Sequence, residues 1–180
     1  KQLVQNYGQQ DYQIIGCSRN SSDLKLKNYR HHTLDINDEK GVKELFTDIR
    51  KKYGRLDCLI NNAGIASMNH SLLTTMETTH KILNTNIAAT FMFSREAAKI
   101  MSKNKWGRIV NFTTVAVPLG LEGEAIYASS KAAVNTLTKV LAKEFSSFGI
   151  TVNAVGPTPV KTNLIKSISK NKLDDLINKQ

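Results

Sequence analysis

The segment YASSK at 127–131 contains a tyrosine and a lysine whose types and spacing could carry acid–base chemistry. On a helix, Tyr127 and Lys131 would project from one face, one turn apart. A free phenol has a pKa of about 10 and is a poor acid or base at neutral pH. A nearby ammonium favours the phenolate and lowers that pKa, so the pair could exchange a proton with a substrate. The spacing alone does not distinguish this site from an ordinary pair on a helix surface.

Other polar residues come directly after predicted strands, where the ligands of α/β proteins bind. Thr114 lies just beyond an apolar run at 108–112. The turn-forming sequence NNAG at 61–64 closes another apolar run at 56–60. Asn86 lies inside a long helical region. Together with the Tyr–Lys pair, these positions define one candidate site at the edge of a sheet.

The elements that must position these residues alternate between two hydrophobic periods. Strands are expected at 12–17, 32–36, 56–60, 108–112 and 150–155, and helices at 1–7, from the cap Asp38 through Ile49, at 72–101 in one or two pieces, and at 127–148. This order predicts a parallel sheet covered by helices on both faces, in a single Rossmann-like, doubly wound α/β domain over residues 1–180.

Finer expectations concern the helices and the cysteines. Gly8 is expected to close the first helix in the left-handed conformation. Apolar side chains should face inward from the second and last helices: Val42, Leu45, Phe46 and Ile49, and Ala132, Ala133, Leu137 and Leu141. Cys17 and Cys58 lie in apolar runs and are expected to be buried free thiols, which favours a cytoplasmic location.

Composition and charge narrow the class of protein. In 180 residues, 41% hydrophobic and 22% charged residues exclude wholesale disorder, and no apolar run is long enough to cross a membrane. The excess of 25 basic over 15 acidic residues, a net charge of +10, suggests an anionic partner such as a phosphorylated cofactor, an acidic carrier protein or nucleic acid. The lysines are dispersed without interleaved aromatics, which argues against nucleic acid. His31 and His32 have no companions at metal-ligand spacing, so no metal is expected.

In order and spacing, these motifs resemble the short-chain dehydrogenase/reductase family from Lys1 to about Leu164, and most closely its 3-oxoacyl-[acyl-carrier-protein] reductases. The resemblance implies that Tyr127 is the general acid and that Lys131 binds the nicotinamide ribose and lowers the Tyr127 pKa. Asn86 would hold a proton-relaying water. Thr114 stands where the family has a catalytic serine, and its hydroxyl can still donate the same hydrogen bond.

The resemblance also implies a cofactor site. Its residues would be Asn61, Ala63 and Gly64 along the adenosine ribose, Asp35 at the adenine edge, and Pro157, Val160 and Thr162 near the nicotinamide. An acid after the strand at 12–17 would bind the 2′-hydroxyl of NAD(H) and repel a 2′-phosphate. Ser18 and Arg19 stand there instead, which favours NADP(H).

Two departures from the family's pattern bear on whether the chain is an active enzyme. Thr158 replaces a glycine after the last motif, and the family's Gly-rich phosphate loop would precede Lys1. We therefore expect the domain to be incomplete at both ends, without the first strand, its loop and the last strand. The chain is either a piece of a full enzyme or a truncated, non-catalytic relative.

The leading hypothesis is an NADP(H)-dependent enzyme that reduces a carbonyl to a secondary alcohol. Its substrate would be a 3-oxoacyl group on acyl carrier protein, as in fatty acid biosynthesis, or a small ketone. Alternatives are a short-chain dehydrogenase of a sugar or other alcohol, and a non-catalytic family relative. The resemblance also implies a cytoplasmic homotetramer or dimer formed through the helices around Leu83 and Tyr127, with no membrane contact.

Overall fold

The computed structural model describes residues 1–158, in which strands and helices alternate as predicted. The strands are β1 (Ile14–Ser18), β2 (Tyr29–Thr33), β3 (Cys58–Asn61), β4 (Gly107–Phe112) and β5 (Ile150–Val155). The α-helices are α1 (Gln2–Tyr7), α2 (Glu39–Tyr53), α3 (Met76–Leu83), α4 (Ala89–Met101), α5 (Ala116–Leu119) and α6 (Ala125–Phe145). A π-helical turn at Asn84–Ala88 joins α3 to α4. The Rossmann-like α/β class is confirmed.

All pairings among the described strands are parallel, and they form two sheets. β1 pairs with β2, with Ile14 opposite Tyr29. β4 lies between β3 and β5, with Cys58 opposite Arg108 and Gly107 opposite Ile150. Within residues 1–158 no strand pairs with both β1 and β3, so the sheet is in two parts where one continuous sheet was expected.

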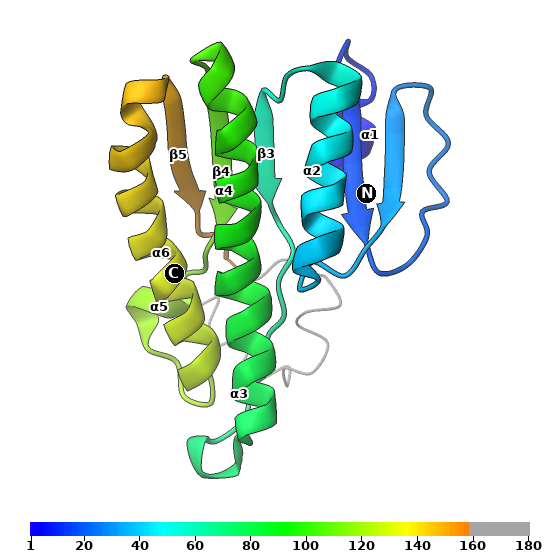
Figure 1. The fold of residues 1–180 in the computed structure, drawn as a ribbon. Coiled ribbons are helices and arrows are strands. Elements are labelled where there is room, and N and C mark those ends of the chain that lie inside the picture. Colours follow the sequence, from blue (N-terminus) through cyan, green and yellow to red (C-terminus); the bar gives the residue numbers. More distant parts are fainter. Residues whose placement is uncertain (159–180) are drawn as a thin grey trace.

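Helices α2, α4 and α6 lie over one face of the strands, and α1 lies behind β1 (Figure 1). In β5, Ile150 and Val152 are buried while Thr151 and Asn153 are exposed. This alternation is that of a strand packed on one face. The expected cover on both faces is therefore present on one face only for β3, β4 and β5 in the described part of the chain.

The core lies between this helical layer and the strands. The predicted inner face of α2 is confirmed: Val42, Leu45, Phe46 and Ile49 are all buried. The Phe46 ring packs edge-on against Phe93 of α4, with centroids 5.5 Å apart. Asp38 caps α2 as predicted, and its carboxylate accepts a hydrogen bond from the Lys40 amide. Burial of each large apolar side chain contributes about 1.5–3 kcal/mol, which fixes α2 on the strands.

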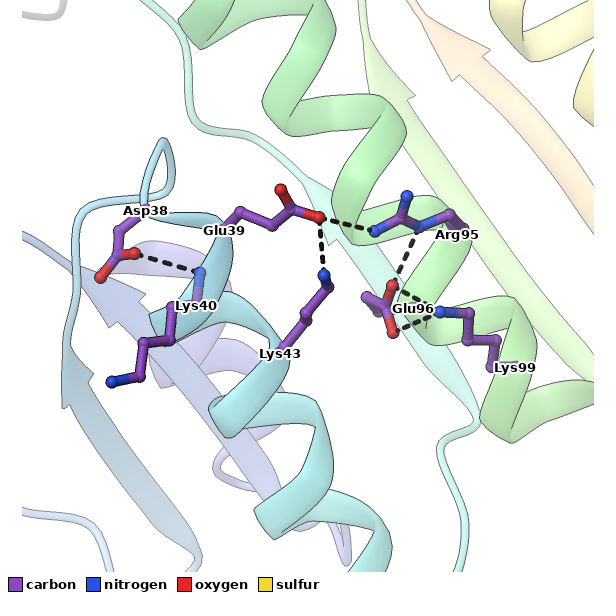
Figure 2. A network of polar contacts seen from close by, with 7 residues as sticks. All are labelled: Asp38, Glu39, Lys40, Lys43, Arg95, Glu96 and Lys99. Carbon is purple, nitrogen blue, oxygen red and sulfur yellow. Dashed lines mark hydrogen bonds and ion pairs between the residues drawn. The ribbon is translucent and has the colours of Figure 1, made fainter.

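Charged side chains also join α2 to α4 (Figure 2). The Glu39 carboxylate accepts from Lys43 at 2.8 Å and from Arg95 at 3.4 Å. Glu96, on the next position of α4, accepts from Arg95 at 2.9 Å and from Lys99 at 2.8 Å. Of these pairs, only Glu39–Arg95 joins the two helices, and as an exposed pair it contributes at most about 1 kcal/mol.

Several local expectations were wrong. Gly8 ends α1 at φ −68°, in the right-handed and not the left-handed conformation. The second strand, expected at 32–36, runs from Tyr29 to Thr33, because its register is set by pairing with β1. Cys58 is exposed and Cys17 is half-buried, so the expected burial of both thiols is wrong.

The inner face of α6 also differs from the expected one. Leu141 is buried as predicted, but Ala132, Ala133 and Leu137 are only half-buried. Val134 and Thr138 occupy the buried positions instead. The buried stripe thus continues from the Tyr127 and Lys131 side chains along one face of the helix. Among residues 1–158, no helix is long and apolar enough to span a membrane.

Candidate active site

The candidate site lies where β3 and β4 end and α6 begins. β3 ends at Asn61 and β4 at Phe112, in parallel register, so both chains leave the sheet at the same edge. Tyr127 and Lys131 lie in the first turns of α6 and are both buried, at 8% and 6% exposure. The predicted convergence of strand ends and the Tyr–Lys helix is therefore present.

Asn86 is placed by the π-helical turn between α3 and α4, and it is fully buried. Its Oδ1 accepts from the Ile65 amide at 2.9 Å, and its Nδ2 donates to the Ile65 carbonyl at 2.9 Å. The Nδ2 group also donates to Ser130 Oγ at 2.9 Å. Asn86 therefore fastens the loop after β3 to α6, and π-helical turns of this kind are frequent at functional sites.

Gly64 brings Asn86 and Lys131 together. A Cβ atom at this position would lie 3.2 Å from Asn86 Oδ1 and 3.2 Å from Lys131 Nζ. Such contacts are tighter than those of an ordinary side chain, so the close approach requires glycine. Ala63, the residue before it, is exposed, so this stretch of backbone is accessible from outside.

The Lys131 ammonium donates to the Phe112 carbonyl at 2.8 Å, at the end of β4. Burial disfavours its charged form and lowers the Lys131 pKa to about 8. One of its three protons is engaged by this carbonyl, and two remain for a ligand.

Thr114 lies just beyond β4, close enough to Tyr127 to act on its pKa, and its Oγ1 accepts from the Ala116 amide at 3.2 Å. Burial raises the Tyr127 pKa, a hydrogen bond with Thr114 lowers it, and the nearby Glu124 charge raises it; the net direction is upward. Lys131, whose ammonium is bonded to the Phe112 carbonyl, is not among the groups that act on the Tyr127 pKa here, so its expected lowering of that pKa stays a prediction.

Two residues of the site were not predicted. Ser130 is fully buried, donates to the Tyr127 carbonyl at 2.7 Å and accepts from Asn86. Glu124 is 7% exposed, and its Oε2 has no hydrogen-bond partner among the described residues. Burial raises the Glu124 pKa. The signal for Ser130 was its place between Tyr127 and Lys131; for Glu124 it was an acid one turn before Tyr127.

The Asn61 side chain faces the helical layer and not the sheet edge. Its Nδ2 donates to Ser94 Oγ at 3.0 Å and to Asn111 Oδ1 at 2.9 Å. Asn111 in turn donates to Thr138 Oγ1 at 2.9 Å. This buried chain of polar groups joins β3, β4, α4 and α6, so the Asn61 side chain supports the site from behind, and only its backbone is left for a ligand.

The remaining predicted cofactor residues lie along the same edge of the strands or beyond them. Arg19 and Asp35 are exposed and follow β1 and β2, whose ends Ser18 and Thr33 lie opposite each other. The Asp35 carboxylate accepts from the Asn37 amide at 2.9 Å. Pro157, after β5, is half-buried. Val160 and Thr162 are outside the described residues, which contain no cluster of metal-ligand side chains.

The family model that describes short chain dehydrogenases matches residues 1–173. The 3-oxoacyl-[acyl-carrier-protein] reductase FabG of Salmonella typhimurium is 32% identical over 152 residues, 84% of this chain and 62% of that protein. The 3-oxoacyl-[acyl-carrier-protein] reductase of Synechocystis is 37% identical over 128 residues, 71% of this chain and 52% of that protein. The chain thus spans less than two thirds of the length of these relatives.

Two solved structures show the same fold. ElxO with NADP bound has a TM-score of 0.85 and 34% identity, covering 99% of this chain and 73% of that one. A 4-hydroxyisoleucine dehydrogenase complexed with NADH has a TM-score of 0.84 and 28% identity, covering 94% of this chain and 74% of that one. These neighbours hold different nicotinamide cofactors, so the likeness alone does not choose between NADP and NAD.

Proposed function

The chain belongs to the short-chain dehydrogenase family, and we propose that the full-length protein is an NADP(H)-dependent oxidoreductase that reduces a carbonyl to a secondary alcohol. The observation that carries the proposal is the burial of Tyr127, Lys131 and Asn86 at one edge of the sheet, with the half-buried Thr114 close to Tyr127. When bound, the cofactor supplies the hydride.

Tyr127 is the proposed general acid. Because burial raises its pKa, the phenol keeps its proton at neutral pH and can deliver it to the oxygen of a reduced carbonyl. Thr114, placed beside the same hydroxyl, would donate a second hydrogen bond to that oxygen. We assign the two residues to the substrate side of the site.

Lys131 is the proposed contact of the nicotinamide ribose, and Gly64, assigned with Asn61 and Ala63 to the adenosine ribose, lies beside it. The absent side chain of Gly64 leaves room beside the lysine, whose free protons can bind ribose hydroxyls. Asn86 would bind the water that relays protons to Lys131. Asn61 and Ala63, by their backbone, continue this path along the sheet edge toward the adenosine.

Of the other assigned residues, Asp35 would contact the adenine edge, and Pro157, Val160 and Thr162 would contact the nicotinamide. None of these four residues is proposed to take part in the proton transfer.

The test of catalysis is Tyr127→Phe in the full-length protein. Removing only the hydroxyl should lower kcat about 100-fold or more, because general acid catalysis contributes about 10²–10⁴-fold, and leave the NADPH affinity within about twofold. Tyr53→Phe, a half-buried tyrosine on α2, is the control. Unchanged kcat in Tyr127→Phe contradicts the proposal, and a wild-type protein that binds NADPH without turnover favours the non-catalytic alternative.

The preference for NADP(H) rests on Arg19, which is exposed beyond β1 where a 2′-phosphate would lie. Arg19→Ala in the full-length protein should raise the KM for NADPH about tenfold and change that for NADH little, since only NADPH carries the 2′-phosphate. Arg30→Ala, an exposed arginine on β2, is the matched control. An unchanged KM for NADPH in Arg19→Ala would contradict the assignment of Arg19 to the 2′-phosphate.

We propose a 3-oxoacyl group on acyl carrier protein as the substrate, supported by the two reductases described above and by the net charge of +10. A sugar or another ketone remains the second candidate, since the neighbouring structures include a dehydrogenase of a different substrate. The kcat/KM for acetoacetyl-acyl carrier protein should exceed that for a free small ketone and fall as salt rises. The reverse order favours the second candidate.

We also propose a cytoplasmic homotetramer or dimer that associates through α4 and α6. Phe91 on α4 and Val140 on α6 are large apolar side chains with 42% and 46% of their surface exposed. The two free cysteines suit a reducing compartment. Light scattering of the full-length protein tests the assembly.

A further inference from the structure

The turn that follows β1 is held by a chain of polar contacts from β2. His31, on β2, lies opposite Gly16 of β1 in the parallel register. Its Nε2 is 2.8 Å from the Asn20 carbonyl oxygen and 3.2 Å from Ser18 Oγ. Ser18 Oγ donates to the same Asn20 carbonyl at 2.8 Å. The turn is thus fixed to the neighbouring strand by side chains as well as by the strand pairing.

The Asn20 carbonyl fixes the tautomer of the neutral His31 ring. It can only accept, so the His31 Nε2 atom carries the proton and Nδ1 is left as an acceptor. The Tyr29 hydroxyl lies 2.8 Å from Nδ1 and donates to it. Gly16 makes room for this tyrosine, since a Cβ there would lie 2.6 Å from the Tyr29 hydroxyl. The hydrogen bonds therefore all donate in one direction, from Tyr29 to His31 and from His31 to the Asn20 carbonyl.

The hydrogen bond from His31 determines how the peptide between Asn20 and Ser21 is oriented. In a trans peptide the carbonyl and the following amide point in opposite directions. Because the Asn20 carbonyl is turned toward His31, the Ser21 amide points away from it, and within residues 1–158 that amide has no backbone hydrogen-bond partner. Arg19 is exposed in the same turn. An amide without a backbone partner and an exposed guanidinium in one turn are donors of the kind that bind a phosphate.

We propose that His31 is a positioning residue that holds this turn in the conformation that accepts the 2′-phosphate of NADP(H). The proposal rests on the proposed function, since it concerns the same cofactor, but it adds a residue on another strand to the determinants of selectivity. His31 does not touch the cofactor; it acts through the Asn20 carbonyl.

His32 provides a matched control in the same strand. Successive side chains of a strand point to opposite faces, so His32 points away from His31. The groups that act on the His32 charge include Asp48 and Lys52 of α2, which places it under that helix. Replacing it removes an imidazole from β2 without touching the Asn20 carbonyl.

The experiment compares His31→Ala and His32→Ala in the full-length protein, with 2′,5′-ADP and 5′-ADP as probes in calorimetry. In His31→Ala the Kd for 2′,5′-ADP should rise about tenfold, the loss of about one well-placed interaction, while that for 5′-ADP changes less than about twofold. His32→Ala should keep both values. His31→Gln, whose amide can donate to the Asn20 carbonyl, should recover most of the affinity.

A ratio of the two Kd values that is the same in His31→Ala and wild type overturns the role of His31 and leaves the proposed function intact. A second readout does not depend on a ligand. Amide hydrogen exchange at 18–22 should be faster in His31→Ala than in His32→Ala; equal rates overturn the proposal. If wild type binds neither nucleotide, the proposed function fails, and these exchange rates still decide whether His31 holds the turn.

Discussion

Burial raises the pKa of Tyr127 and lowers the pKa of Lys131, the two ionisable groups at the centre of the site. Both pKa shifts favour the neutral form of the side chain. The Tyr127 pKa is raised, so its proton stays in place at neutral pH. The Lys131 pKa is lowered to about 8, so part of the lysine population is already neutral in mildly alkaline solution. A site with these properties is suited to donating a proton from the phenol, the step that carbonyl reduction requires.

Glu124 tunes this balance, and its effect on pH dependence is testable. Its charge raises the Tyr127 pKa, so Glu124→Gln should lower that pKa. Alcohol oxidation needs the phenolate, so its rate should rise at a lower pH in the variant. Reduction needs the phenol, so its loss at high pH should also begin earlier. The measurement is kcat/KM against pH in the full-length protein, in both directions.

Glu122→Gln is the matched control, because it removes the same charge from an exposed residue in the same loop. Its pH profile should coincide with that of wild type. If the two variants shift the profile equally, the effect is one of net charge, and Glu124 has no particular role. If neither shifts it, the carboxylate of Glu124 does not act on Tyr127.

The residue types of the site could be predicted from sequence, but their partners could not. Tyr127, Lys131, Asn86 and Gly64 stand at the ends of predicted elements, and parallel strands bring such ends together. Which atom each one bonds depends on distances between elements. The contact of Lys131 with the Phe112 carbonyl is an example, because no local pattern in the sequence indicates that this carbonyl is the partner of the ammonium.

At the scale of elements, Ser130 ties the π-helical turn to α6, and its replacement tests that connection. In Ser130→Ala, one N–H of the Asn86 amide loses its buried acceptor. An unsatisfied buried donor costs about 1–3 kcal/mol, so the free energy of unfolding should fall by that amount. Ser129→Ala, at the exposed neighbouring position, should stay within about 0.5 kcal/mol of wild type. Urea unfolding measures both.

An equal loss in the two variants would mean that the hydroxyl of Ser130 contributes nothing specific. Activity separates the roles further. Because Ser130 also donates to the Tyr127 carbonyl, Ser130→Ala should lower kcat more than it raises KM. A rise in KM alone would place the effect on substrate binding and not on the position of Tyr127.

Elements with a local signature were predicted well, and those set by distant contacts were not. Helix α2 carries its cap and four inward apolar residues within its own sequence. Strand β2 does not: the apolar residues Leu34 and Ile36 favoured a strand at 32–36, and only pairing with β1 selects Tyr29–Thr33. The π-helical turn likewise depends on Asn86 meeting Ile65, a loop residue far away in the chain. Local periodicity contains no information on either contact.

At the scale of the whole molecule, the proposed cofactor would contact two sheets that share no strand pairing within the described part of the chain. Arg19 and Asp35 follow the strands of one sheet, whereas Gly64 follows β3 of the other, and Lys131 of α6 is bonded to the end of β4 in that sheet. A single ligand that spans both groups would stabilise each sheet and the connection between them. Binding to the folded state alone adds about 2.7 kcal/mol when the ligand is at about 100 times its Kd.

Hydrogen exchange of the full-length protein, with and without saturating NADPH, tests this connection. Protection should rise both at 18–22, after β1, and at 61–65, after β3, because one molecule orders both segments. The fragment 2′,5′-ADP, which lacks the nicotinamide and its ribose, is the control: it should protect 18–22 and, through the adenosine, the backbone of Asn61 and Ala63, and leave the start of α6 around Lys131 nearly unchanged. Protection by NADPH at only one of the two segments would show that the cofactor does not bridge the sheets, and the assignment of Gly64 and Lys131 to the riboses of the cofactor would then be wrong.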